Sequence, residues 1–305
     1  MLTTLATLAG LALAQQTDTT VPVRAGARLE VNNFGGEIAV KTWSKSAVRI
    51  AASHSSRDRI TIDASDQVVR VKSESRRGPS QVVDYEITVP AAMALALSGV
   101  YTDISVEGSE GEITAETVQG TVKVSGGVGT VSLKSVQGDV TLEKARGRID
   151  LSSVNETIKA SQISGDVSAE TVNGDISLMQ IESANTEATT VNGDVTYDGT
   201  IKDGGRYRFS THDGDLRVSV PEKASVSVSV STFNGDFNAC FPVQLTGKTK
   251  HRFSLTIGSG TARLELESFD GDIRLCRPGQ LAKDKDWRVK DKDWDKDHNN
   301  DQEEE

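Results

Sequence analysis

Six aspartates that each directly follow a glycine are the residues of this chain best placed to bind a ligand: Asp139, Asp175, Asp194, Asp215, Asp236 and Asp272. On stacked strands such carboxylates would lie ~4.8 Å apart and repel one another, so a row of them invites a divalent cation. The Gly-Gly-x-Gly-x-Asp pattern of calcium-binding nonapeptide arrays is absent, however, and Thr121 and Thr157 interrupt the row. Hydrogen bonding of each aspartate within its own turn is therefore favoured, and a calcium-stabilised repeat protein is an alternative.

Signatures of an enzyme are scarce. The four histidines, His54, His212, His251 and His298, have no spacing typical of a metal site or of a nucleophile with its base. Acids such as Asp166 and Asp194 could lie near Arg146, Arg148 or Lys159, so a carbohydrate-active lyase or hydrolase is the alternative. Ordinary surface charge explains these residues equally well. We predict no enzymatic activity, and no catalytic, cofactor-binding or metal-binding residue.

The elements that carry these residues follow a nine-residue repeat. Glycines occur at Gly111, Gly120, Gly129, Gly138, Gly147, Gly165 and Gly174, with Glu156 at the missing step. Apolar residues recur two, four and seven positions after each glycine, as in Val131, Leu133 and Val136, and all three positions are expected to point inward. Motifs such as Thr171-Val172-Asn173-Gly174 recur on every second half-repeat. Short periods of this kind mark stacked units. The predicted fold is all-β, a single-stranded β-solenoid (β-helix) with ~18-residue coils built from two nine-residue half-repeats.

The motif glycine is expected to turn a corner of the coil, because glycine adopts a positive φ with little strain. The predicted repeat-corner glycines are Gly120, Gly138, Gly174, Gly193, Gly214, Gly235 and Gly271. The residue before each is an amide or an aspartate, and amides stacked on successive coils are expected to hydrogen-bond to one another.

Later coils lengthen, because the motif glycines move apart from Gly193 to Gly214 and Gly235, and the next one comes only at Gly271. Longer coils leave room for loops and for aromatic residues such as Tyr197, Tyr207, Phe209 and His212, so any binding site is expected around 197–215 and 241–268. Cys240 and Cys276 each lie five positions after a motif glycine. They are predicted to form a disulfide if residues 241–268 make one enlarged coil or hairpin, and two free or separately buried thiols are the alternative.

The chain divides into four predicted parts. Residues 1–14 are expected to be a signal peptide, since an apolar run ends in Ala12-Leu13-Ala14. Residues 15–98 are an irregular β-rich part that caps the solenoid, and 99–280 are the solenoid repeats, with the enlarged 241–277 coil capping the other end. Residues 281–305 are a charged disordered tail with the repeated sequence KDKDW.

These motifs resemble a bacterial β-strand-repeat family known as "putative adhesins", a domain of unknown function. The resemblance covers residues 25 to 277 and includes Val31-Asn32-Asn33-Phe34-Gly35-Gly36, the Ile87-Thr88-Val89-Pro90 before the repeats, and Ser268-Phe269-Asp270-Gly271-Asp272 at their end. It implies an adhesin-like β-solenoid in an exported or envelope-associated protein, and it implies no catalytic residues.

The predicted function is therefore a non-enzymatic, adhesin-like binding or structural scaffold without a cofactor. Its net charge of −10 and pI near 5.0 argue against nucleic acid as a partner. The expected partner is an unknown protein or glycan of the cell envelope, and no transmembrane segment is expected in the mature chain. The expected location is the periplasm, the cell surface or the extracellular space.

Overall fold

The computed structural model describes residues 15–75 and 82–281. In this part of the chain there is no α-helix, and the 24 strands are all joined by hydrogen bonds in one long mixed sheet. It follows that no described helix has the length and apolarity needed to cross a membrane. The predicted signal peptide (1–14) and the predicted charged tail beyond Leu281 lie outside the described residues.

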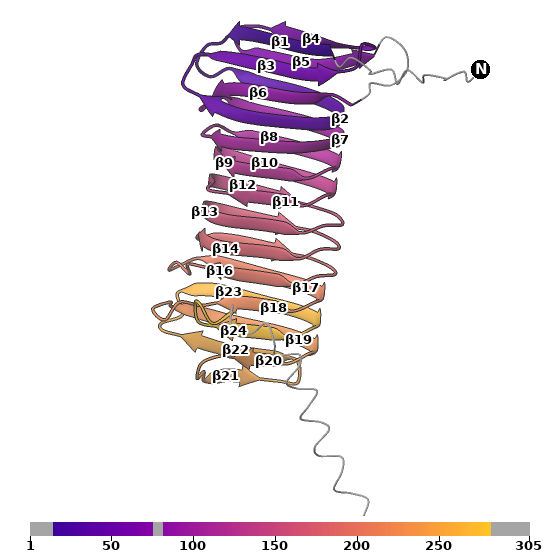
Figure 1. Cartoon of the computed structure of the whole chain (residues 1–305). Coiled ribbons are helices and arrows are strands. Elements are labelled where there is room, and N and C mark those ends of the chain that lie inside the picture. Colours follow the sequence, from indigo (N-terminus) through magenta and orange to yellow (C-terminus); the bar gives the residue numbers. More distant parts are fainter. Residues whose placement is uncertain (1–14, 76–81, 282–305) are drawn as a thin grey trace, which may run out of the picture.

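The strands stack in two columns, and each strand is hydrogen-bonded to the strands above and below it (Figure 1). The first column contains, in spatial order, β4 (Asp58–Ala64), β5 (Val68–Ser75), β2 (Arg28–Trp43), β7 (Ala94–Ser109), β8 (Ile113–Gln119), β10 (Val128–Gln137), β12 (Arg146–Ser152), β13 (Ile158–Glu170), β15 (Asn185–Thr189), β17 (Arg206–Asp213), β23 (Ala262–Asp270), β19 (Val226–Asn234), β22 (Arg252–Ile257) and β21 (Leu245–Lys248).

The second column shares the long strands β2, β7 and β13, which bend from one column into the other. It contains, in spatial order, β1 (Gln15–Pro22), β3 (Ala47–His54), β6 (Asp84–Pro90), β2, β7, β9 (Val122–Gly126), β11 (Val140–Glu143), β13, β14 (Ile176–Glu182), β16 (Val195–Gly199), β18 (Leu216–Ser219), β24 (Ile273–Cys276) and β20 (Phe237–Ala239).

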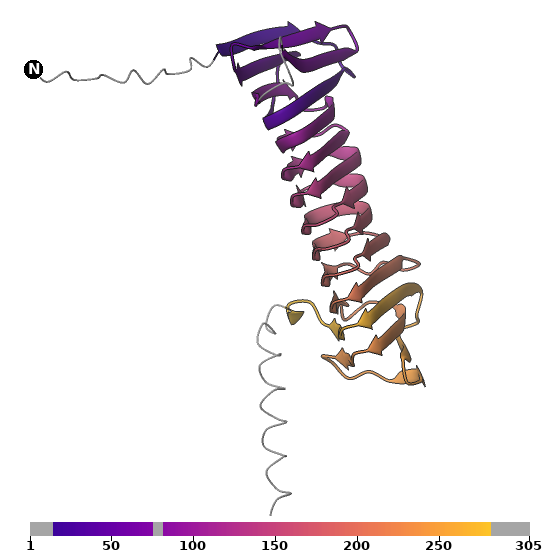
Figure 2. The same cartoon turned by 90° about the vertical axis from the view of Figure 1, so that its right-hand side faces the viewer.

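We call two strands that are consecutive in the chain and lie one in each column a rung. Rungs in the middle are parallel and in register, since Val131 pairs with Ile149 and Ile149 pairs with Val167. Antiparallel pairs occur at the two ends, where β1, β3 and β4 lie at one end and β22 and β21 at the other. Figure 2 shows the resulting narrow stack.

Side chains alternate between inward and outward positions along each strand, and the inward ones form the core. In β10 the side chains of Val131 and Leu133 are fully buried, and in β11 those of Val140 and Leu142 are fully buried too. Small aliphatic residues fill most rungs, and the stretched rungs are filled by Tyr197, Tyr207 and Phe209. The hydroxyl of Tyr207 donates to Ser183 O at 2.7 Å, so this large side chain is both packed and hydrogen-bonded.

The expectation that all three apolar positions of each half-repeat point inward is wrong for one of them. Seven positions after glycine, Val136 and Val172 are each 40% exposed, whereas Ala145 and Ile163 on the other half-repeat are buried. The reason is strict alternation, because Ser135 and Thr171 take the inward position and the next residue must point out.

The order of the last rungs in space differs from their order in the chain. Strand β23 lies between β17 and β19, and β24 lies between β18 and β20. Residues 241–261 contain the β21–β22 hairpin, which extends the first column beyond β19, and the chain then returns to form β23 one rung earlier (Figure 1). The prediction that all of 241–277 caps the end is therefore wrong for residues 262–276, which are inserted within the stack.

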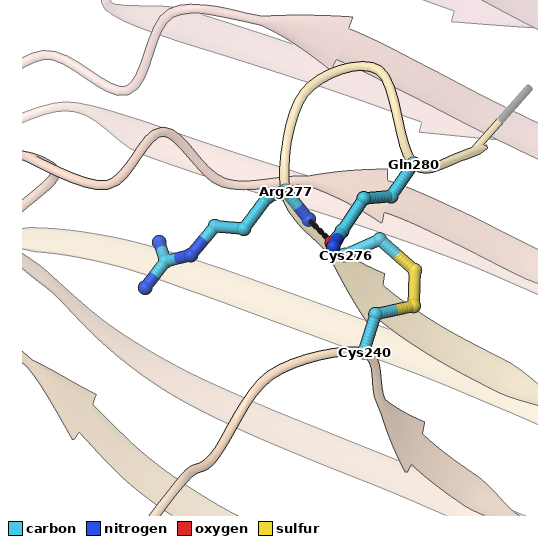
Figure 3. Close-up of a disulfide and its surroundings, with 4 residues drawn as sticks. All are labelled: Cys240, Cys276, Arg277 and Gln280. Atoms are coloured by element: carbon cyan, nitrogen blue, oxygen red, sulfur yellow. Dashed lines mark hydrogen bonds between the residues drawn. A yellow bond between two sulfur atoms is a disulfide. The ribbon is translucent and has the colours of Figure 1, made fainter.

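The two cysteines meet because of this insertion. Ala239 pairs with Leu275, and the next residues, Cys240 and Cys276, form a disulfide with a Cα–Cα distance of 4.7 Å (Figure 3). Directly after the disulfide, Arg277 N donates to Gln280 Oε1, and the Arg277 guanidinium lies 3.7 Å from the centre of the Phe241 ring. These contacts tie the last described residues to the end of the stack.

The motif glycines stack in one corner column, which contains Gly120, Gly138, Gly174, Gly193, Gly214, Gly271 and Gly235 in spatial order. A Cβ on any of them would lie closer than 3.0 Å to a backbone carbonyl oxygen of the preceding rung, a distance that Cβ atoms essentially never show. The close approach of two backbones therefore requires glycine in this column. In the opposite corner, Gly147 has a positive φ of 122°, which also favours glycine.

We expect Gly138→Ala to lower the free energy of unfolding by about 3 kcal/mol, because the new methyl group would force two rungs apart. Gly247→Ala is the matched control, since a Cβ there meets only ordinary contacts with Ser254. Urea denaturation of both variants measures the difference. Equal stability of the two variants would show that the corner tolerates a side chain.

We expect the double variant Cys240→Ser/Cys276→Ser to lose about 4 kcal/mol of stability, because the disulfide closes a long loop, with a sequence separation of 36, in the unfolded chain. A thiol assay of the unfolded, unreduced parent protein should detect no free cysteine. Two reactive thiols per chain would contradict the disulfide.

Candidate functional site

A column of buried hydroxyl groups runs beside the glycine column. Each belongs to the serine or threonine three positions before the corner residue, and each donates to the carbonyl oxygen of the corner residue one rung earlier, at 2.9–3.4 Å. The donors are Thr117, Ser135, Ser153, Thr171, Thr190, Thr211, Ser268 and Thr232. A buried carbonyl left without a partner costs ~1–3 kcal/mol, so these hydroxyls account for a polar residue at an inward position.

The residue after each hydroxyl is apolar or aromatic and points to solvent. We call this column the apolar ridge, and it comprises Val118, Val136, Val154, Val172, Val191, His212, Phe269 and Phe233 in spatial order. Its valines and phenylalanines are 36–53% exposed. At the far end, Phe34 is 40% exposed and its ring packs edge-on against Tyr101. Exposed apolar residues aligned over successive rungs form one continuous strip rather than scattered surface residues.

Stacked rings end the apolar ridge. The rings of His212, Phe269, Phe233 and His251 lie face to face, with centroid distances of 4.8, 5.1 and 4.5 Å and interplanar angles of 13° or less. A groove of about 610 Å³ runs beside these rings, and Ser210, Ser231, Arg252 and Glu267 also line it. The ring edges and this groove together offer an apolar surface with polar groups at its side, as binding sites commonly do.

The predicted amide row flanks the ridge and does form a ladder in its middle part. Asn173 Nδ2 donates to Asn155 Oδ1 at 3.1 Å, and Asn192 Nδ2 donates to Asn173 Oδ1 at 2.7 Å. Each bond links the amides of neighbouring rungs, so the ladder stabilises the edge of the ridge.

The aspartate row is engaged in hydrogen bonds between rungs. Carboxylates of this row accept the backbone N–H of the equivalent residue one rung on, at 2.7–3.2 Å; the acceptors are Asp103, Asp139, Asp175, Asp194, Asp215 and Asp272. These hydrogen bonds therefore join neighbouring rungs. The sequence had suggested instead that each aspartate bonds within its own turn. The guanidinium of Arg217 also contacts Asp194 and Asp215 at 2.9 and 3.0 Å. Within residues 15–75 and 82–281, no group of three or more His, Cys, Asp or Glu is placed to hold a metal ion.

Of the residues considered for carbohydrate chemistry, the structure pairs only Asp166 with Arg148. Asp166 lies beside Arg148 in the first column, whereas Asp194 is at the glycine corner with Arg217, and Lys159 is on the second column. Asp166 and Arg148 line a hollow of about 620 Å³ on the outer face of the first column. Of the aromatic residues expected at a binding site, Tyr197, Tyr207 and Phe209 are buried in the core, and His212 alone is on the surface strip.

The ridge was not anticipated from the sequence. The available signal was the position two before each corner residue, which reads Val, Val, Val, Val, Val, His, Phe, Phe along the chain. The preceding serine or threonine is equally regular, and a regular hydroxyl beside a regular apolar residue could have indicated which of the two points inward. The sequence contains no such signal for His251, because this residue reaches the ring stack from the turn of the β21–β22 hairpin and stacks on Phe233.

Comparison with known proteins identifies the family. The family described as Toastrack DUF4097 matches residues 28–276, more than half of the chain. The chain therefore belongs to this family of β-repeat domains of unknown function, as the sequence motifs had indicated. A comparison with curated proteins found no match.

The solved structures that share the fold include two from Parabacteroides. One is a "putative adhesin" from Parabacteroides distasonis ATCC 8503, 9% identical, with 87% of this chain and 98% of that chain covered and a TM-score of 0.50. The other is a "putative adhesin" from Parabacteroides merdae ATCC 43184, 12% identical, with 86% of this chain and 96% of that chain covered and a TM-score of 0.50. At these identities the similarity shows the fold alone.

Val136→Thr and Val140→Thr test the direction of the ridge side chains. Both replace valine by a residue of the same shape, but Val136 is exposed and Val140 is fully buried. We expect Val136→Thr to change the free energy of unfolding by less than about 0.5 kcal/mol, and Val140→Thr to lower it by about 2 kcal/mol. Denaturant unfolding measures both, and a similar loss in the two variants would place Val136 in the core.

Proposed function

We propose that this chain is a non-enzymatic, exported or envelope-associated binding protein, adhesin-like in function, built as a β-solenoid. The proposed coil consists of two nine-residue halves, so that one full turn leads from Val131 to Ile149 and the next from Ile149 to Val167. Parallel pairing within both of these pairs supports this coil length in the regular part.

The same proposal gives each part of the chain a role. Residues 1–14 direct export, 15–98 cap the first end, and 99–280 form the repeats, whose other end is closed by the β21–β22 hairpin. Antiparallel strands at both ends support this division, because an uncovered parallel rung would expose a row of unpaired backbone groups and promote aggregation.

The observation that carries the proposed function is the apolar ridge. Burying apolar surface contributes ~25 cal/mol per Å², and a fold gains nothing by leaving such a strip in water. Nothing in the alternation forces valine or phenylalanine there, since polar residues occupy other outward positions such as Lys134 and Glu170. A partner that covers the ridge would recover this free energy, and the ring stack with its groove would be the strongest part of the contact.

Phe233→Ser/Phe269→Ser should weaken binding to envelope material while leaving the fold intact, because both rings are about half exposed. We expect at least a tenfold loss of affinity when the purified protein is titrated against isolated envelope proteins and cell-wall polysaccharides. The control is Met179→Ser/Leu245→Ser, which removes two exposed apolar side chains away from the ridge. Unchanged binding by the ridge variant, with a melting temperature like that of the parent, would contradict the proposal.

A carbohydrate-active lyase or hydrolase is the competing function, and turnover distinguishes it. Release of shorter fragments from a neutral or uronate polysaccharide, abolished by Asp166→Asn, would establish an enzyme and refute the binding-only proposal.

A further inference from the structure

The hollow on the outer face of the first column is a second surface, separate from the apolar ridge. Outward side chains of five adjacent strands line it, from β12, β13, β15, β17 and β23. Most of the side chains that line it are charged or polar, and Ile149, Val167 and Tyr207 are buried beneath them. It therefore calls for a polar ligand.

Two arginines lie side by side in this hollow without neutralisation. Arg206 of β17 and Arg263 of β23 are direct register partners on adjacent parallel strands, so their Cα atoms are only ~4.8 Å apart. Like charges directly opposite one another are destabilising. Among the residues that the structure describes, neither guanidinium makes an ion pair or a side-chain hydrogen bond.

The flanking residues do not supply the missing anion. Beyond Arg206 in the same row is Asn185, whose amide donates to Asp166 Oδ1 at 3.0 Å and so engages that carboxylate. Beyond Arg263 is Ser227, a neutral residue. In the next row Arg208 has Glu187 on one side and Glu265 on the other, so that row carries one more negative than positive charge. Across the whole hollow four arginines face four carboxylates, and what distinguishes Arg206 and Arg263 is that they lie directly beside each other with no carboxylate next to them in their own row.

We propose that Arg206 and Arg263 bind the carboxylate of an acidic saccharide. Two guanidinium groups present several N–H donors to one anionic group, which is the geometry that arginine offers to carboxylates. The carboxylates of Glu187, Glu265 and Asp150 around the pair repel a densely charged polyanion such as nucleic acid or an acidic peptide. They are good acceptors for neutral hydroxyl groups, however, and a uronic acid carries one carboxylate among several hydroxyls. Asn185 and Ser168 add further polar groups along the hollow.

Isothermal titration with oligouronates tests this site, using the full chain. Galacturonate, glucuronate and mannuronate oligomers are compared with the methyl ester of the bound oligomer, which keeps the hydroxyls and loses the charge. We expect micromolar to millimolar binding of at least one oligouronate, at least a tenfold loss on esterification, and weakening with added salt. No binding of any oligouronate, or equal binding of the ester, would overturn the proposal.

Arg206→Gln/Arg263→Gln should reduce the affinity at least tenfold, and Arg206→Lys/Arg263→Lys should give an intermediate loss, because lysine keeps the charge but not the planar donors. The matched control Arg57→Gln/Arg59→Gln removes the same charge from exposed positions of the N-terminal hairpin. An equal loss of affinity in the control would show that net charge alone causes the effect, and would contradict a site at Arg206 and Arg263. Tighter binding of polyglutamate, or of inorganic phosphate, than of the oligouronate would also overturn the saccharide assignment. Phe233→Ser/Phe269→Ser should leave this binding unchanged, so failure here is separate from failure of the ridge.

Discussion

The approach of one backbone to the next at the glycine corner is the constraint on which the rest of the structure depends. Most rungs pass so close to the preceding one that the corner residue must lack a Cβ, as between Gly138 and the carbonyl oxygen of Gly120, and Glu156 is the one exception between Gly138 and Gly174. The carbonyl oxygens brought inside by this approach need donors, and the serine and threonine hydroxyls three positions earlier provide them. Once a hydroxyl is inside, alternation turns the following valine outward. Corner packing, the buried hydroxyls and the outward direction of the ridge residues are thus three effects of one close contact, whereas the apolar identity of those residues is not imposed by it.

Much of the fold was predictable because its period is short. Regular glycines and β-branched residues at a fixed interval leave few arrangements other than stacked strands, and the two cysteines at equivalent positions follow from the same register. The inward or outward direction of Val136 was not predictable from hydrophobicity, because apolar residues are expected inside and the alternative, Ser135, is polar. The deciding factor is a hydrogen bond from Ser135 to the carbonyl of Gly120 on another rung, and its geometry becomes visible only in three dimensions.

The order of the last rungs is a second reason why the sequence did not predict the two candidate binding surfaces. Stacking in chain order would place β19 directly on β17 and would set Arg206 beside Ser227. Insertion of β23 instead places Arg206 against Arg263 and Phe269 between His212 and Phe233. Both surfaces therefore contain residues far apart in the sequence that a repeat-by-repeat alignment assigns to separate rungs. They differ in chemistry, with rings and valines on the corner and arginines with carboxylates on the outer face.

The inserted rung also separates the order of the strands in the chain from the order in which they pair. Most rungs pair with the rung that directly precedes them in the chain, so they can form progressively during synthesis, with the small entropy cost of local contacts. The pairing of Arg206 with Arg263 instead joins strands between which all of β18 to β22 intervenes, and β19 has no parallel partner until β23 arrives. In the structure the strands of residues 226–257 pair only with one another and with β23 and β24, so their pairing is complete only when these C-terminal strands are in place. The Cys240–Cys276 bond joins the last two rungs at this place, so it fixes the inserted rung covalently to the end of the stack.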